Sequence, residues 1–298
     1  MDLAVIEEEV TKIKQMDDNR NSFKTKEYAE IPLYITELTK LKEKTNKPET
    51  VKTRYIKGYR EYYIVESKKW VPSMTSVLGI LPKPGLDIWK AQFTATQYAD
   101  YMLFVQRLGE AIHYQVADCM LQYFGTDEAK AKATQEVPAF IYTAPATELA
   151  LYQTYLLVTA EMVRQFIYIY QNRIRLLDIE TFCYNKELGY GGRFDLLFEI
   201  FENGRWVKCI GDIKTSKALY PTVPAQLTGY QLALASMNTY HAERLYELRF
   251  HPSYDEPDDL GWEMVILKQD IPLLTKARDD FYLADNLKKQ AKKNNIKR

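Results

Sequence analysis

The chain has 298 residues, enough for one large domain or two small ones at about 150 residues per domain. Its 27% of charged residues is ordinary for a globular protein, and 40 acidic residues balance 40 basic ones, so no global charge indicates nucleic-acid binding. The apolar runs are far shorter than a membrane span, and the acidic start is unlike a signal peptide, so we expect a cytoplasmic protein with no membrane association. The three cysteines are scattered and form no CxxC pair, so we expect no disulfide framework, zinc site or iron–sulfur cluster.

Residues 1–53 are predicted to form a helical N-terminal extension to a domain at 54–298. The first 50 residues are rich in charge and contain no glycine. Apolar residues recur there at helical spacing, namely Val5, Ile6, Val10, Ile13, Ile35, Leu38 and Leu41.

The next part of the chain is predicted to be a hairpin, a loop and a helical wall. Tyrosines and β-branched residues surround Lys57-Gly58 in residues 54–66, which indicates a β-hairpin. A loop with three prolines follows. Two long helical patterns, at about 86–124 and 146–172, form the expected wall.

From residue 174 the pattern changes to strands and predicts a core over about 174–268. Three strands are expected at 174–186, 194–201 and 205–215, then a helix at 223–240, two more strands at 243–251 and 261–268, and a closing helix at about 271–290. This order predicts an α/β fold with a mixed β-sheet flanked by helices.

Asn203-Gly204 fixes the register of the central hairpin, because both residues tolerate the positive φ of a type I′ turn. Glu202 then pairs with Arg205, and Glu199 faces Lys208. One predicted face is apolar and buried: Phe194, Leu196, Phe198, Ile200, Val207, Cys209, Gly211 and Ile213. The other face carries Asp195, Glu199, Lys208, Asp212 and Lys214.

The same register places Asp195 opposite Asp212, with Lys214 beside them. Two facing carboxylates lie about 5 Å apart at Cβ and repel each other. A cation between them removes that repulsion, and Mg²⁺ or Mn²⁺ prefers such oxygen ligands. A surface salt-bridge cluster on an exposed strand face is the simpler alternative, and a β-bulge near the site would shift the register.

Several short motifs together resemble a known nuclease family. They are Gly192 to Asp195 (GxxD), Asp212 to Lys217 (DIKTSK), Gln226 to Tyr230 (QxxxY), Gly109 to His113 (GxxxH), and residues 71–92 (VPSMTSVLGILPKPGLDIWKAQ). The set resembles the PD-(D/E)XK nuclease superfamily, in its RecB-like and lambda-exonuclease-like branch, and looks most similar to exonucleases of the mitochondrial genome maintenance and phage types. The resemblance spans about residues 71–240.

The resemblance implies a restriction-endonuclease-like sheet and a Mg²⁺ or Mn²⁺ site. His113, Asp195, Asp212 and the backbone carbonyl of Ile213 would hold the metal, with Glu180 as a weaker candidate ligand. The expected catalytic residues are Asp195, Asp212, Lys214, Gln226 and Tyr230. The cysteine-ligated iron–sulfur cluster of some relatives is not expected.

Weaker expectations concern contacts with nucleic acid. Ser73 and Thr75 would bond phosphates, and Trp89 and Tyr190 would stack on bases. The remaining candidates are Arg193, Thr215, Ser216 and Lys217. Turn chemistry and core packing explain Ser73, Thr75, Trp89 and Tyr190 equally well.

The expected function is therefore metal-dependent exonucleolytic hydrolysis of DNA, in recombination, repair or processing in a bacterial cell or phage-infected host. DNA ends or single strands would be the substrate, with a recombination or single-strand-binding protein as a further partner. Two alternatives stay open, a structure-specific endonuclease with the same site and a DNA-binding protein of the same fold that does not catalyse.

Overall fold

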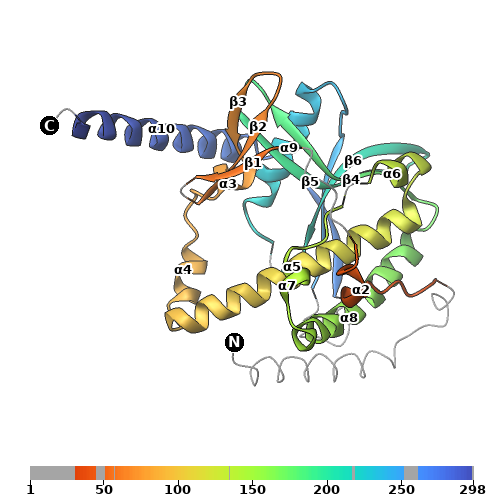
Figure 1. Ribbon diagram of the computed structural model, residues 1–298. Helices are drawn as coiled ribbons and strands as arrows, with labels where there is room; N and C mark the ends of the chain where they lie inside the picture. Colours follow the sequence, from red (N-terminus) through yellow and green to blue (C-terminus); the bar gives the residue numbers. More distant parts are fainter. Residues whose placement is uncertain are drawn as a thin grey trace.

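The computed structural model describes residues 31–44, 51–56, 58–133, 135–216, 219–251 and 261–296, with only the backbone for 288–296. It is an α/β protein built on a five-stranded mixed sheet with helices packed against it (Figure 1). The strand order is β4-β5-β6-β7-β8, comprising Ile174–Asn185, Tyr190–Glu202, Arg205–Lys214, Arg244–Phe250 and Trp262–Leu267. The mixed sheet expected from the order of elements is confirmed.

The β5–β6 hairpin has the predicted turn and register. Asn203 and Gly204 have φ values of 49° and 78°, as a type I′ turn requires. Glu202 pairs with Arg205 and Glu199 with Lys208. Local turn chemistry therefore sets the register of the two strands that carry Asp195, Asp212 and Lys214.

One part of the predicted strand face is wrong. Leu196 and Phe198 pack on the side of α5 (Ala95–Phe124) and α8 (Ala146–Tyr170), but Phe194 belongs to the cluster around α9 (Val223–Ser236). The regular β5–β6 pairing ends at Leu196 and Gly211, one pair before Asp195. The alternation of faces therefore changes at Asp195.

Helices cover both faces of the sheet (Figure 1). The larger apolar cluster joins one face to α5 and α8, and the second joins the other face to α3 (Met74–Leu78), α9 and the start of α10 (Ile271–Ile296). The simpler alternative of a salt-bridge cluster on an exposed strand face does not fit the end of β6 that carries Asp212, because α9 packs against it. Nearer the turn, Lys208 on the same face is exposed.

Helix α9 is the crossover between the parallel strands β6 and β7. It ends at Ser236, shorter than the expected 223–240, and Tyr230 is almost fully buried on it. Strands β7 and β8 pair antiparallel and match the predicted strands closely.

The predicted helix at 86–124 is two helices. α4 (Pro84–Lys90) is separate from α5, which begins with a capping box at Thr94 and Gln97. The backbone amide of Gln97 donates to the Thr94 hydroxyl, and the backbone amide of Thr94 donates to the side-chain carbonyl of Gln97. These bonds start a new helix where the apolar period alone predicts continuity. Two short helices, α6 (Asp127–Lys132) and α7 (Phe140–Thr143), lie in the loop before α8.

The expected hairpin near residue 58 is confirmed and has a third strand. β1 (Thr53–Ile56), β2 (Tyr59–Ile64) and β3 (Lys69–Pro72) form a small antiparallel sheet. The region of β3 is predicted to be a loop because of its proline, but Pro72 is the last residue of an edge strand, where proline is tolerated.

The described part of the N-terminal extension contains one short helix, α2 (Leu38–Leu41). The longer helix predicted from Ile35, Leu38 and Leu41 is wrong for these residues. The amides of Thr36 and Leu38 donate to the side chains of Gln115 and Gln153, which replace helical bonds. Residues 1–30, with the rest of that prediction, lie outside the described residues.

Candidate metal centre

The Asp195 carboxylate lies where the β5–β6 ladder ends. Its Oδ2 accepts a hydrogen bond of 2.6 Å from the backbone amide of Ile213. A side chain thus takes the place of the backbone partner that a regular antiparallel strand would supply. The resemblance assigns the Ile213 carbonyl to a metal, and the structure shows its amide engaged by Asp195.

Asp212 and Lys214 form an ion pair on the face of β6 that α9 covers. Gln226 on α9 donates to Asp212 Oδ1 at 2.9 Å, and its amide nitrogen is 3.5 Å from the Tyr230 hydroxyl. Residues four apart on a helix share one face, so α9 presents both side chains toward Asp212. The structure therefore brings together Asp195, Asp212, Lys214, Gln226 and Tyr230, as predicted.

Gly192 is required for this packing. A Cβ at this position would lie 2.5 Å from Cε1 of Tyr230. The glycine of the GxxD motif thus allows the Tyr230 ring to lie directly against strand β5.

His113 reaches the same place from α5. Its Nδ1 lies 3.6 Å from Asp195 Oδ2, and its side chain is 28% exposed. Burial, together with the Lys214 charge, lowers the pKa of His113 to about 4. The imidazole is therefore neutral near pH 7, the form in which histidine binds a metal.

Glu180 completes a group with His113 and Asp195. Each of the three offers a nitrogen or oxygen atom, and these atoms lie within 4.8 Å of one another. Glu180 is on β4 with a positive φ of 49°, an irregularity between the ladder pairs that Ile179 and Thr181 make with β5. Backbone strain of this kind in a non-glycine residue concentrates at functional sites.

The acids of the group are short of positive charge. Burial, and after it the nearby Asp195 carboxylate, raises the pKa of Glu180 to about 8. Burial also raises the pKa of Asp195 and Asp212, although Lys214 opposes both shifts. Burial alone would lower the pKa of Lys214, but Asp212 and Asp195 outweigh it and raise that pKa.

A divalent cation fits this donor set. One neutral imidazole and carboxylate oxygens suit Mn²⁺, and the oxygens suit Mg²⁺. A cation would also stabilise the ionised forms that burial disfavours. The resemblance ranks Glu180 as the weaker ligand and Asp212 as a principal one, whereas the compact group contains Glu180, and Asp212 is bonded to Lys214 and Gln226.

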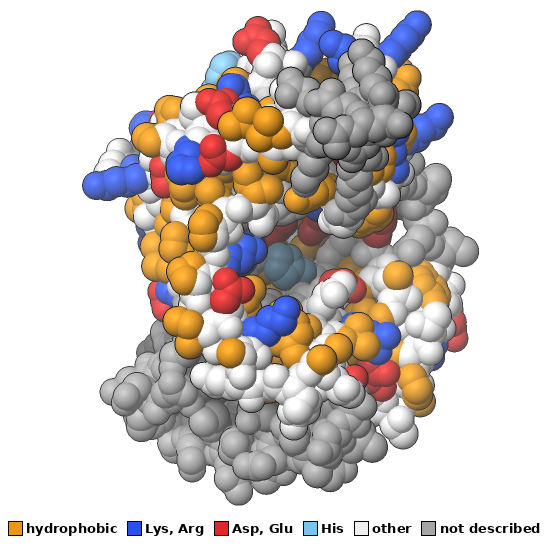
Figure 2. All heavy atoms as spheres, turned by 90° about the vertical axis from the view of Figure 1, so that its left-hand side faces the viewer, with side chains coloured by type: hydrophobic (Ala, Val, Ile, Leu, Met, Phe, Trp, Pro, Cys, Tyr) orange, Lys and Arg blue, Asp and Glu red, His pale blue; other side chains and the backbone are white. Residues whose placement is uncertain are grey.

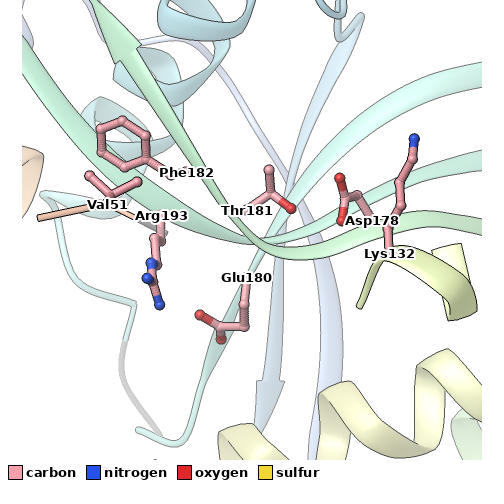
Figure 3. Close-up of a pocket in the computed structure, with 7 residues that line it drawn as sticks. All are labelled: Val51, Lys132, Asp178, Glu180, Thr181, Phe182 and Arg193. Atoms are coloured by element: carbon pink, nitrogen blue, oxygen red, sulfur yellow. The ribbon is translucent and has the colours of Figure 1, made fainter. Parts of the chain in front are cut away.

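A pocket of about 370 Å³ opens beside Glu180. Figure 3 shows the side chains of Glu180 and Arg193 extending in the same direction. Val51 and Phe182 lie near Arg193, and Asp178 and Lys132 lie on the other side of Glu180. Arg193 is ion-paired with Glu136 at 3.2 Å. The pocket thus places the Arg193 cation next to Glu180 of the metal group.

The surface near this region is hollowed. Figure 2 shows a recess on the side of the molecule where α4 lies, with acidic and basic side chains and one histidine at its back. The 28% exposure of the His113 side chain shows that solvent reaches the metal group.

Two expected nucleic-acid contacts do not fit the structure. Ser73 is 1% exposed and its hydroxyl caps α3 by accepting from the Ser76 amide. Tyr190 is fully buried and donates to the Gly229 carbonyl at 3.1 Å. Core packing and capping, the alternative explanation of these residues, account for both.

The other expected contacts differ in position. Thr75 is exposed, and Thr215 and Ser216 follow the end of β6 and are half-buried. Trp89 is a residue of α4, and its ring lies among other aromatic rings, with its centre 4.7 Å from that of Phe93. Lys217 lies outside the described residues.

The sequence alone gave no reason to select Glu247 and Arg249 on β7. Glu247 pairs with Asp212 in the parallel β6–β7 ladder and is fully buried. Burial, opposed by Arg249 and supported by Asp212, raises the pKa of Glu247 to about 7. The available signal was a pair of charges two residues apart in the interior of the strand RLYELRF, whose other interior residues are leucines and a tyrosine.

No protein-family model matches the chain, and no curated protein is similar to it. In the described part of the chain, no helix is both long enough and apolar enough to cross a membrane.

Proposed function

We propose that this protein is a Mg²⁺- or Mn²⁺-dependent deoxyribonuclease of the PD-(D/E)XK kind, with a restriction-endonuclease-like core and exonuclease activity of the RecB type. One observation carries the proposal: Asp195, Asp212 and Lys214 meet at the irregular end of one hairpin, where His113 and Glu180 join them. The motif resemblance over residues 71–240 supports it independently of the geometry.

His113, Glu180 and Asp195 would hold the metal, with Asp212 adjacent. A bound Mg²⁺ or Mn²⁺ supplies Lewis acidity, which lowers the pKa of water and neutralises charge on a phosphodiester. The neutral state of His113 leaves a nitrogen lone pair for that ion.

Lys214 is the cationic group for the reacting phosphate. Its raised pKa keeps the ammonium charged at neutral pH. It can orient the attacking water or stabilise negative charge on the pentavalent phosphate. The reaction is then an in-line hydrolysis without a covalent enzyme intermediate, since the group contains no activated serine or cysteine.

Gln226 and Tyr230 position the second carboxylate. The Gln226 amide holds Asp212 Oδ1, and burial raises the pKa of Tyr230 well above its usual value, so the phenol stays neutral. These contacts fix the Asp212 carboxylate from α9 while Lys214 contacts its other oxygen.

The pocket beside Glu180 supports a polyanionic substrate. Arg193 lines it and would exchange Glu136 for a phosphate of the nucleic acid.

The test is digestion of end-labelled single- and double-stranded DNA with and without Mg²⁺ or Mn²⁺. We expect metal-dependent shortening from one end, and a loss of about 10²–10³-fold in rate for Lys214→Ala. Lys208→Ala is the matched control, because Lys208 is an exposed lysine on the same strand and far from the ladder's irregular end.

Three results would change the proposal. Cleavage of a covalently closed single-stranded circle would assign an endonuclease. Cleavage of RNA in place of DNA would correct the substrate. The absence of cleavage on linear, circular and branched DNA and on RNA would reject catalysis and leave a binding protein.

A further inference from the structure

Glu247 is a buried carboxylate that the proposed reaction leaves without a role. It is 0% exposed, and among the described residues neither carboxylate oxygen has a hydrogen-bond partner. Its closest cationic contact is Arg249 Nε, 3.8 Å from Oε1. Burying a carboxylate with so little compensation is costly, so a nearby positive charge is needed to stabilise its ionised form.

Lys214 is near enough to supply that charge. In the parallel β6–β7 ladder Asp212 pairs with Glu247, and Lys214 pairs with Arg249, so all four side chains point to the same face of the sheet. Glu247 and Lys214 are thus diagonal neighbours on adjacent strands, about 7–8 Å apart, a separation that a lysine side chain can span.

These groups form a charged row across the sheet in which Asp212 pairs with Glu247 and Lys214 pairs with Arg249, so that opposite charges on β6 and β7 are diagonal neighbours. On β8, Glu263 pairs with Arg249. The row ends at the exposed Glu263, which is ion-paired with Arg249. Arg249 is therefore shared between two carboxylates, and it contacts Glu263 more closely than Glu247. Arg249 therefore compensates Glu247 only in part, and Lys214 is the second cation on that face beside it.

Asp212 holds Lys214 through Oδ2 while its Oδ1 accepts from Gln226. Under the proposed function the Asp212 charge is also shared with a dication beside it. A dication also repels the ammonium. A second carboxylate on the side away from the metal group would retain the ammonium there.

We propose that Glu247 is a positioning residue that holds the Lys214 ammonium beside Asp212 in the catalytic arrangement. This inference rests on the proposed nuclease function. Glu247 acts through Lys214 and touches neither substrate nor metal. The competing explanation is that Glu247 serves only as a counterion that fixes Arg249 in the fold.

The experiment is a double-mutant cycle of Glu247→Gln and Lys214→Met, read by cleavage rate and by Tm at about pH 8.5, above the Glu247 pKa of about 7, where the carboxylate is ionised. Glu247→Gln keeps the shape and removes the charge. We expect its rate at saturating DNA to fall about 10–100-fold with KM unchanged, as for other residues that orient a catalytic group. In the Lys214→Met background Glu247→Gln should cause no further loss, because its effect passes through Lys214.

The Tm readout does not depend on activity. In Lys214→Met the Glu247 carboxylate has lost a compensating charge. The change in Tm caused by Glu247→Gln should therefore be about 2–4 °C more positive in the Lys214→Met background than in wild type. Glu263→Gln is the matched control at the exposed end of the same row, and it should change Tm equally in both backgrounds and leave the rate unchanged.

The outcomes separate the two proposals. If wild type cleaves nothing, the nuclease function fails, and the Tm cycle alone decides whether Glu247 and Lys214 are coupled. If wild type cleaves, additive Tm changes together with an additive loss of rate would overturn the positioning role. A raised KM with unchanged rate at saturation would overturn it as well.

Discussion

The two ends of the β5–β6 hairpin follow different rules. At the turn, Asn203 and Gly204 adopt positive φ and every pair from Glu202–Arg205 to Leu196–Gly211 is regular. At the other end the backbone ladder stops, and the Asp195 carboxylate accepts the hydrogen bond of the Ile213 backbone amide. Local sequence determines the first end, and side chains from distant elements determine the second.

The difference extends to electrostatics. Near the turn, charges such as Lys208 are exposed. At the irregular end, Asp195 and Asp212 are buried with raised pKa values, beside a strained Glu180. Buried carboxylates and backbone strain lower the stability of the fold, and they concentrate at functional sites. Here they coincide with the proposed metal and phosphate chemistry.

The largest expected effect comes from removing one charge at the irregular end. Asp212→Asn keeps an oxygen for Gln226 but loses the ion pair with Lys214 and a negative charge of the metal group. We expect the DNA cleavage rate to fall about 10²–10³-fold, measured in single-turnover digestion with Mn²⁺. Glu199→Gln, on the same hairpin in the regular region, should cleave as wild type does, and an equal loss in both variants would count against the contrast.

The glycines of the two ends provide the next test. In Gly192→Ala the new Cβ would lie 2.5 Å from the buried Tyr230 ring. We expect this overpacking to lower the free energy of unfolding by about 1–3 kcal/mol. Cleavage should also fall, because a displaced Tyr230 ring shifts Gln226, one turn away on the same helix. Gly204→Ala meets no atom within 4 Å but has a φ of 78°, so it should cost about 1 kcal/mol by backbone strain and leave cleavage intact. Urea unfolding and digestion of both variants measure the difference, and unimpaired cleavage by Gly192→Ala would remove Tyr230 from the site.

A pH dependence distinguishes the metal group from the rest of the hairpin. The pKa of Glu180 is raised to about 8 in the folded protein from 4.5, so the folded state binds more protons than the unfolded one between these values, and metal-free stability falls as pH rises through that range. Glu180→Gln removes this dependence and should raise the metal-free Tm at pH 8 by a few degrees, with little change at pH 4.5.

The control for this prediction is the metal itself. Mn²⁺ should raise the Tm of wild type at pH 8 by binding the folded state, and Glu180→Gln should reduce that rise. A wild-type Tm that is unchanged by Mn²⁺ would argue against a cation in this group.

The features that followed from local rules could be predicted from the sequence. The Asn203-Gly204 turn fixes the register, and counting from it brings Asp195, Asp212 and Lys214 together. The capping box at Thr94 was also present in the sequence, but the uninterrupted apolar period hid it. The third small strand was hidden by Pro72, whose position at an edge is known only once β2 pairs with it.

The rest depended on contacts between distant segments. Phe194 changes face because the ladder ends beside it, and Glu180 joins the metal group through a local backbone irregularity that no turn residue announces. Glu247 enters only because β7 runs parallel to β6 after the α9 crossover. Tyr190 was expected to stack on a base, but it is buried and its hydroxyl donates to the Gly229 carbonyl on α9.

The smallest expected effect lies at the regular end and tests whether that end is as simple as its register suggests. Glu199 and Lys208 are ladder partners, yet the Lys208 ammonium lies 5.3 Å from the centre of the Tyr240 ring. If the cation–π contact is what Lys208 contributes, Lys208→Met should cost about 0.5 kcal/mol and Glu199→Gln should cost less, both measured by urea unfolding. Equal costs that vanish at high salt would instead assign the stabilisation to the opposite charges on neighbouring strands, and the regular end would then depend on the pair as the sequence predicted.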